Sequence, residues 1–264
     1  MTDLTALIAK IVFATTTATT PAKAPVKAPA PIVVAQAPAA AAKALTAVEI
    51  VDNVQKFYAG ISQVTAKFRQ TVTNSTFGTS KVSDGKLMLL KPGKMRWDYA
   101  SASKKKAAAW EKSFISDGKM LYVVEYDNLQ IVKKNLEKDL MPVAVSFLYG
   151  KGDLKAEFTP ALDTSGTYGE KGDYVLKLTP KAPSAQYKAL ILVVKPDNFR
   201  VQQSIIIDSS DNKNHFAFHS PDFKTAIAPT KFDFNPKDKA YKNYRVIDAD
   251  QPQTAAPGAK PATK

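Results

Sequence analysis

The chain contains 264 residues, of which 45% are hydrophobic, and it carries a formal net charge of +13 from 37 Lys and Arg against 24 Asp and Glu. It has no cysteine, which excludes disulfides, thiol nucleophiles, cysteine–zinc sites and a lipidated N-terminal cysteine. Only four of the basic residues are arginine, the side chain whose planar fork reads phosphates and bases. The charge therefore indicates attraction to anionic surfaces or acidic partners, and we expect no nucleic-acid binding.

The two ends of the chain differ in composition from its middle. Residues 1–44 combine a short apolar run, Ala6 to Ala14, with an Ala/Pro-rich stretch, and residues 250–264 resemble that stretch. The apolar run suits a signal-peptide core, although Lys10 interrupts it and no basic residue precedes it. A divergent signal peptide and a misplaced start both fit this pattern. We predict disordered ends over 1–44 and 250–264 and one domain over 45–249.

The domain is predicted to begin with one amphipathic helix. Thr46 and Glu49 have the spacing of a capping box, in which each side chain bonds to the backbone amide of the other residue. Apolar residues then recur at helical spacing from Val48 to Ile61, and Gly60 marks the end of the pattern. The length corresponds to about four helical turns.

Short strand patterns separated by turns follow the helix. The first alternates Val64, Ala66, Phe68 and Val72 with polar neighbours, as expected for a strand with one buried face. Asp139–Tyr149 interrupts the series with the pattern of a short helix. Around eleven or twelve such strands predict a mainly β fold, an antiparallel meander that curls. The later strands are expected at Lys86–Leu90, Lys94–Tyr99, Lys112–Ser116, Met120–Tyr126, Leu129–Lys133, Leu154–Thr159, Tyr174–Thr179, Tyr187–Lys195, Phe199–Asp208, Asn214–His219 and Lys231–Phe234.

Several of these strands are apolar on both faces. The pattern is present in Leu87–Leu90, Met120–Val124, Ala189–Val194 and Ile205–Ile207, whereas a sheet with one face in water alternates cleanly. A sheet with two apolar faces needs a layer of the protein packed against each face. Either a helix packs on one side and another layer on the other, or one face curves around an apolar cavity closed by helices. The strand pattern alone favours the first arrangement.

No group of residues indicates catalysis or metal binding. His215 and His219 are four residues apart, but on a strand this spacing separates them by about 13 Å along the chain. Asp208 to Lys213 supplies oxygen ligands without the spacing of a calcium loop, and it is better explained as a polar hairpin turn. No phosphate-binding loop, dinucleotide fingerprint or nucleophile elbow is present. We expect a protein that is not an enzyme and uses no cofactor.

The segment from Gly85 to Tyr122 carries a family resemblance. A strand ending in LMLL is followed by the turn Lys91-Pro92-Gly93, the strand KMRWDY, a lysine-rich link and the hairpin FISDGKMLY around Asp117-Gly118. An Asp-Gly pair between apolar runs is among the strongest hairpin signals. The order and residues resemble the central segment of the LolA family of periplasmic lipoprotein carriers. The resemblance extends roughly from Ala47 to Pro236.

The resemblance implies a fold, a function and a location. The fold would be an incomplete, half-open antiparallel β-barrel of about eleven strands with a helical lid over a hydrophobic cavity. The function would be to bind the acyl chains of lipoproteins in that cavity and carry them through the periplasm of a Gram-negative bacterium. The implied partners are acylated lipoproteins, an inner-membrane lipoprotein-releasing ABC transporter and an outer-membrane lipoprotein acceptor, and the protein would be a monomer.

The resemblance also assigns candidate residues. Lys91 takes the place of a family arginine that bonds to lid carbonyls, so it is the candidate for lid control. Lysine keeps the charge but loses the planar fork of donors. The resemblance also assigns six apolar residues to the cavity wall, and each of these six is equally compatible with plain core packing. The candidate cavity-lining, lipid-binding residues are Val64, Phe68, Met95, Trp97, Phe114 and Val143.

Two alternative functions remain open from the sequence. One is a lipid- or glycolipid-binding envelope protein of the same fold, which would carry free lipids or sense envelope stress by binding them. The other is a basic adaptor that binds anionic partners through its lysines and has no lipid cavity. Salt-dependent binding without lipid would favour the adaptor.

Overall fold

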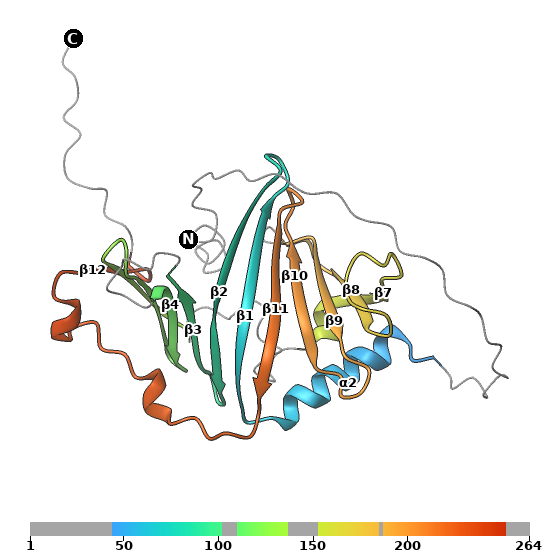
Figure 1. The fold of residues 1–264 in the computed structure, drawn as a ribbon, viewed down its shortest axis with the longest axis horizontal. Helices are drawn as coiled ribbons and strands as arrows, with labels where there is room; N and C mark the ends of the chain where they lie inside the picture. The colour runs from blue at the N-terminus through green and yellow to red at the C-terminus, as the bar shows by residue number, and fades with distance from the viewer. Residues whose placement is uncertain (1–43, 102–109, 137–152, 185–186, 252–264) are drawn as a thin grey trace, which may run out of the picture.

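The computed structural model describes residues 44–101, 110–136, 153–184 and 187–251. These residues form one twelve-stranded sheet with the order β12-β6-β5-β4-β3-β2-β1-β11-β10-β9-β8-β7 (Figure 1). The predicted mainly β, incomplete barrel is confirmed. The strands are β1 Gln63–Asn74, β2 Thr79–Leu90, β3 Lys94–Ala100, β4 Trp110–Asp117, β5 Met120–Glu125, β6 Gln130–Asn135, β7 Phe158–Leu162, β8 Tyr174–Pro180, β9 Ala189–Val194, β10 Val201–Ile207, β11 Lys213–Asp222 and β12 Arg245–Asp248.

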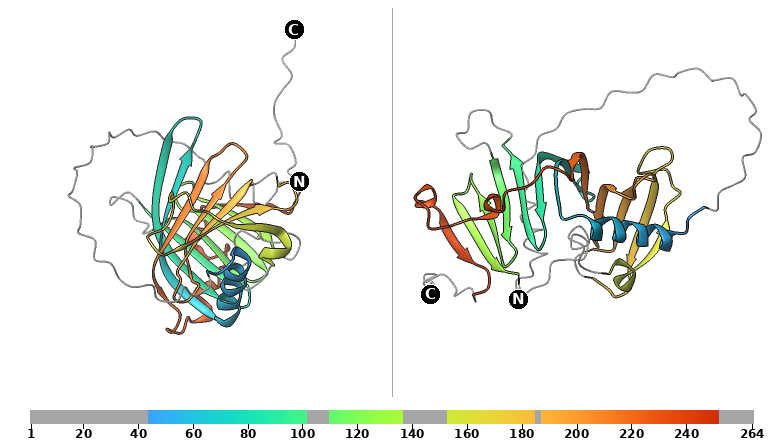
Figure 2. Two further views of the ribbon diagram at one scale, coloured as in Figure 1. Left: turned by 90° about the vertical axis from the view of Figure 1, so that its right-hand side faces the viewer. Right: turned by 90° about the horizontal axis from the view of Figure 1, so that it is seen from below.

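The sheet is a meander in two halves that join at its centre. β1 pairs with β2 on one side and with β11 on the other, so the first and the eleventh strand are neighbours. All pairs are antiparallel except the edge strand β12, which runs parallel to β6. Within the described residues, β7 and β12 form the two edges. Seen from below, the two halves lie on either side of the central strands β1, β2 and β11 (Figure 2).

The predicted helix is α2 (Ala47–Gly60), and its capping box forms as expected. The backbone amide of Glu49 bonds to the Thr46 hydroxyl at 3.3 Å, and the amide of Thr46 bonds to the Glu49 carboxylate at 2.7 Å. Helix α2 crosses the half of the sheet made by β7–β10 (Figures 1 and 2). Its apolar stripe is buried in the main core and consists of Ile50, Val51, Val54 and Tyr58.

The outer face of the sheet is also covered, which explains the strands that are apolar on both faces. Over β4–β6, the outward Ile115, Val124 and Ile131 lie under aromatic side chains of the segment 229–244. Over β8–β10, the outward Ile191, Val193 and Ile205 pack with Tyr168 from the β7–β8 connection. The layered arrangement favoured by the strand pattern is therefore present on the outer face. On the inner face, a helix covers one half of the sheet.

One expected strand is wrong in part and another is wrong. Leu154–Thr159 begins with a short helix, α4 (Leu154–Glu157), because the Asp153 carboxylate accepts hydrogen bonds from the amides of Lys155 and Ala156 and caps a helical turn. Lys231–Phe234 is not a strand, since Pro229 begins the 3-10 helix η2 (Pro229–Phe232). A second 3-10 helix, η3 (Lys239–Tyr241), and strand β12 were not expected.

Some of the expected elements lie outside the described residues, whereas the expected turns lie within them. The helix expected at Asp139–Tyr149 and both predicted disordered ends lie outside the described residues, apart from the few positions next to the domain. The turns at Lys91-Pro92-Gly93 and Asp117-Gly118 are confirmed as the β2–β3 and β4–β5 connections. The Asp208–Lys213 segment is the β10–β11 turn, where the Asp208 carboxylate accepts bonds from the amides of Ser210 and Asn212.

Candidate functional site

The inner face of the sheet carries a continuous apolar surface. Strand register aligns Leu87, Trp97, Phe114 and Val123 across β2 to β5, so these side chains form one row on that face. Five of the six candidate lining residues lie in this single core cluster with α2, and the sixth, Val143, lies outside the described residues. The five are Val64, Phe68, Met95, Trp97 and Phe114.

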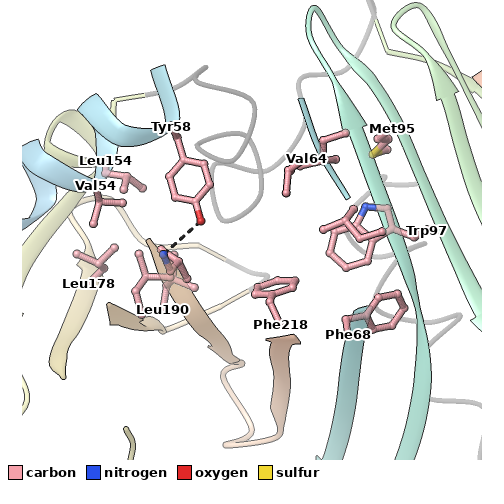
Figure 3. Close-up of a cluster of buried hydrophobic side chains, with 14 of the residues drawn as sticks. Val54, Tyr58, Val64, Phe68, Met95, Trp97, Leu154, Leu178, Leu190 and Phe218 are labelled. Carbon is pink, nitrogen blue, oxygen red and sulfur yellow. Dashed lines mark hydrogen bonds between the residues drawn. The ribbon is translucent and has the colours of Figure 1, made fainter. Parts of the chain in front are cut away.

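Aromatic rings dominate the centre of this surface. The Phe68 ring lies 5.2 Å from the Trp97 ring and 5.0 Å from the Tyr99 ring, measured between centroids. Phe216 lies 5.4 Å from Trp97 and continues the aromatic surface onto β11. Figure 3 shows Phe68 and Trp97 on one side and the side chains beneath α2 on the other, with Phe218 between the two groups.

An apolar pocket opens where these two groups meet, near the end of α2. Its empty space is about 350 Å³, a volume that includes open solvent at its mouth. Strands β1 and β2 supply its aliphatic wall, and the end of α2 and the β10–β11 strands supply the rest. The lining residues are Tyr58, Val64, Ala66, Leu87, Leu89, Arg200, Val201, Phe218, Pro221 and Phe223.

Tyr58 joins α2 to the far half of the sheet at the pocket wall. Its hydroxyl oxygen accepts a hydrogen bond of 3.2 Å from the backbone amide of Val201, the first residue of β10 (Figure 3). Burial raises the pKa of the Tyr58 hydroxyl far above its ordinary value, so this hydroxyl stays protonated. The bond fixes the end of α2 against β10 from inside the core.

Lys91, the candidate for lid control, reaches the same end of α2 from the β2–β3 turn. Its ammonium donates hydrogen bonds to the carbonyl oxygen of Tyr58 and, at 3.4 Å, to that of Ala59. Partial burial lowers the pKa of Lys91. The end of α2 is therefore fastened twice, by Tyr58 to β10 and by Lys91 to the β2–β3 turn.

Two cations face the apolar interior, and sequence reasoning singled out neither. Lys112 holds its ammonium 4.9 Å from the ring centre of Tyr99 and 5.3 Å from that of Phe114, and desolvation lowers the pKa of Lys112. Arg200 lines the pocket beside Tyr58. Lys112 lies two residues before Phe114 on the same strand, so alternation places it on the inner face. Arg200 precedes β10 and has no such signal, so only the fold reveals its position.

Of the five candidate lining residues in the described ranges, only Val64 borders the pocket. Phe68, Met95, Trp97 and Phe114 lie farther along the same inner face, where they pack against one another. Leu87, Leu89 and Ala66 were missed as pocket residues, although their strand register with Val64 identifies them. Ala66 faces Leu87, and Val64 faces Leu89, across the β1–β2 pair.

The described part of the chain contains no cluster of three or more His, Cys, Asp or Glu side chains that could hold a metal ion. His215 lies on the outer face of the sheet, opposite Ile205, and bonds through Nε2 to the Gln203 side chain at 2.9 Å. His219 is exposed on the same strand. Neither histidine faces the pocket.

None of the helices in the described ranges is long and apolar enough to cross a bilayer. The longest of them, α2, has 14 residues, which is shorter than a transmembrane helix requires.

Comparison with known proteins gives consistent matches over most of the chain. The family model described as "Outer membrane lipoprotein carrier protein LolA" matches residues 59–235. The outer-membrane lipoprotein carrier protein of Chromobacterium violaceum is 26% identical over 207 residues, which are 78% of this chain and 93% of the relative. The outer-membrane lipoprotein carrier protein of Methylobacillus flagellatus is 24% identical over 184 residues, which are 70% of this chain and 83% of the relative. Among solved structures, a LolA superfamily protein of Nitrosomonas europaea aligns over 72% of this chain and 99% of its own, with 12% identity and a TM-score of 0.39.

Proposed function

The chain belongs to the LolA family of outer membrane lipoprotein carrier proteins, and we propose that it binds the acyl chains of lipoproteins on the inner face of its sheet. In this role it takes lipoproteins from an inner-membrane ABC transporter and delivers them to an outer-membrane acceptor. It acts in the periplasm as a monomer, without catalysis and without a cofactor.

The observation that carries this proposal is the apolar pocket beneath the end of α2. Its walls are aliphatic and aromatic, and its mouth is open to solvent. An acyl chain gains about 0.8 kcal/mol for each methylene group that it buries. A surface of this kind therefore binds acyl chains strongly without any specific polar contact.

The size of the pocket implies that α2 moves when cargo binds. About 350 Å³, part of it solvent at the mouth, does not hold the three acyl chains of a mature lipoprotein. Movement of α2 away from β10 would join the pocket to the aromatic surface around Phe68 and Trp97. Such movement breaks the contacts of Tyr58 and Lys91, so we propose that these two residues set the ease of opening.

The proposal is tested by transfer of cargo. Purified protein is incubated with membranes that contain a triacylated lipoprotein and its releasing transporter, and the soluble fraction is analysed for a one-to-one complex. A complex with the acylated form, and none with a form that lacks the acyl chains, is the expected result.

Two other outcomes would contradict the proposal. Binding of both forms alike, with strong salt dependence, would indicate an adaptor that uses its lysines. Absence of any complex from a folded protein, together with co-purified free lipid, would indicate a lipid-binding envelope protein of the same fold.

A further inference from the structure

Arg200 stands apart from the arginines on β1 and β3 in having no anionic partner. Arg69 pairs with Asp84 and Arg96 pairs with Asp98, both at 2.8 Å. Among the residues that the structure describes, no ion pair includes Arg200. Its Nη1 atom is buried and has no hydrogen-bond partner. A buried guanidinium donor without an acceptor is costly, so its place in the fold calls for an explanation.

The surroundings of Arg200 point to a ligand rather than to a structural partner. The residue lines the apolar pocket, where its neighbours are the Tyr58 ring, Val201, Phe218 and Phe223. The backbone around it is held independently of the side chain, because its amide bonds to the Asn198 carboxamide at 3.0 Å and its carbonyl accepts from Lys195. The side chain is therefore available to bind a ligand that enters the pocket.

We propose that Arg200 makes this pocket selective for an acyl chain that ends in a carboxylate, that is, a free fatty acid anion. The inference rests on the proposed use of the pocket for acyl chains and adds a ligand class to it. The chain would lie along Val64, Leu87 and Leu89, and its carboxylate would accept hydrogen bonds from the guanidinium. An arginine fork matches a carboxylate with two parallel bonds, and such charge-assisted bonds are stronger in a desolvated site.

The overall charge of the protein is not enough to explain such selectivity. A net charge of +13 attracts any anion, but this attraction is spread over the surface and weakens with salt. Replacement of one arginine changes the formal charge only from +13 to +12. Selectivity that depends on Arg200 would therefore report a local contact.

The test compares dodecanoate with methyl dodecanoate, which has the same chain and a neutral ester head. Both are titrated into delipidated full-length protein by calorimetry at about pH 8, where the acid is ionised. We expect dodecanoate to bind at least about tenfold more tightly. In Arg200→Met the two affinities should agree within about twofold, and Arg200→Lys should keep part of the preference.

The matched control is Lys177→Met, which removes one exposed charge from β8, a strand of the same half of the sheet. It should keep the full preference for dodecanoate. Equal binding of both probes to the wild type, or a preference that persists in Arg200→Met, would overturn the role of Arg200 and leave acyl binding intact. Failure of both probes to bind would overturn acyl binding in this pocket altogether, and the inference with it.

Discussion

The Lys91 ammonium donates hydrogen bonds to the carbonyl oxygens of Tyr58 and Ala59, which belong to the last turn of α2. That turn contains no basic residue of its own, and the last four carbonyls of a helix have no partner within it. A cation at this position satisfies them and interacts favourably with the helix dipole. Lys91 thus caps a helix that ended 31 residues earlier in the chain, counted from Gly60 to Lys91.

Replacement of this cap should loosen the end of α2. Lys91→Met keeps the apolar stem and removes both hydrogen bonds, and we expect the free energy of unfolding to fall by about 1 kcal/mol because Lys91 is partly exposed. Amide exchange in the last turn of α2 should become faster. Lys119→Met, an exposed lysine in the next hairpin, is the control. Equal exchange rates in the two variants would show that Lys91 does not hold the helix.

Tyr58 should make stability depend on alkaline pH. Its hydroxyl ionises near pH 10 in the unfolded chain, whereas burial raises the pKa of Tyr58 in the folded protein. Above pH 10 the folded state therefore binds more protons than the unfolded state, and stability is lost as the pH rises towards the folded-state pKa. Below pH 10 this contribution is fully present.

The variant Tyr58→Phe isolates that contribution. At neutral pH we expect it to lose about 1–3 kcal/mol, because the backbone amide of Val201 loses its acceptor in the core. Urea unfolding of both proteins across pH 8 to 11 should show the difference shrinking above about pH 10. A difference that stays constant over this range would contradict the described burial of the hydroxyl.

On the outer face, Asp98 fastens the segment 229–244 to the sheet. Arg96 Nε donates to its two carboxylate oxygens at 3.0 and 2.8 Å, the Ser113 hydroxyl donates at 2.5 Å, and Arg96 Nη1 donates to the carbonyl of Lys231 at 3.2 Å. Asp98→Asn should cost about 3 kcal/mol, since it leaves the largely buried guanidinium without its anion. Thermal unfolding and exchange in the segment 229–244 measure the effect.

Asp84→Asn provides the comparison for Asp98→Asn. Asp84 pairs with Arg69 in similar geometry, but both side chains are more than half exposed, at 55% and 59%. An exposed ion pair contributes little to stability. We therefore expect no measurable loss from Asp84→Asn, and similar losses from both variants would contradict the assignment of Asp98 as a fastening point.

Gly85 allows the aromatic surface to form. A side-chain carbon at this position would lie 2.3 Å from the carbonyl oxygen of Asp98 and 2.3 Å from Cζ of Phe68, because Gly85 faces Phe68 across the β1–β2 pair. Gly85→Ala should destabilise the fold by about 1–3 kcal/mol, because both the Phe68 ring and the Asp98 backbone must shift. Gly60→Ala, with no atom within 4 Å, should not destabilise it. Chemical denaturation of the two variants, with near-ultraviolet circular dichroism for the rings, tests this contrast.

The elements that are determined locally could be predicted from the sequence. The capping box at Thr46, the alternation from Val64 to Val72 and the Asp117-Gly118 turn each depend on neighbouring residues, and all three are confirmed. Strand β12 could not be predicted, because its four residues form a strand only through parallel pairing with β6, more than a hundred positions earlier.

The sequence allowed prediction of the residues on the inner face, but not of the place where the pocket forms on that face. Alternation identifies Val64 and Phe68 as inward-facing, yet it does not tell which part of that face packs solidly and which part stays open. That depends on where α2 ends against β10, a tertiary contact made by Tyr58 and Val201. The same contact brings Arg200 to the pocket, and no local pattern indicates it.

Ala66 offers the most direct test of the pocket as the acyl site. It lies on the inner face of β1 between Val64 and Phe68, and it is the smallest side chain that lines the pocket. In Ala66→Phe the added ring would occupy the space, at a folding cost of about 1–3 kcal/mol. Affinity for a triacylated lipopeptide should then fall by at least about tenfold.

The control adds the same ring to the other face of the same strand. Lys67 is exposed and points outward, so Lys67→Phe changes hydrophobicity and charge but not the pocket. It should bind the triacylated lipopeptide within about twofold of the wild type. A folded Ala66→Phe protein with unchanged affinity would place the acyl chains on another surface, because a filled pocket has no room for them.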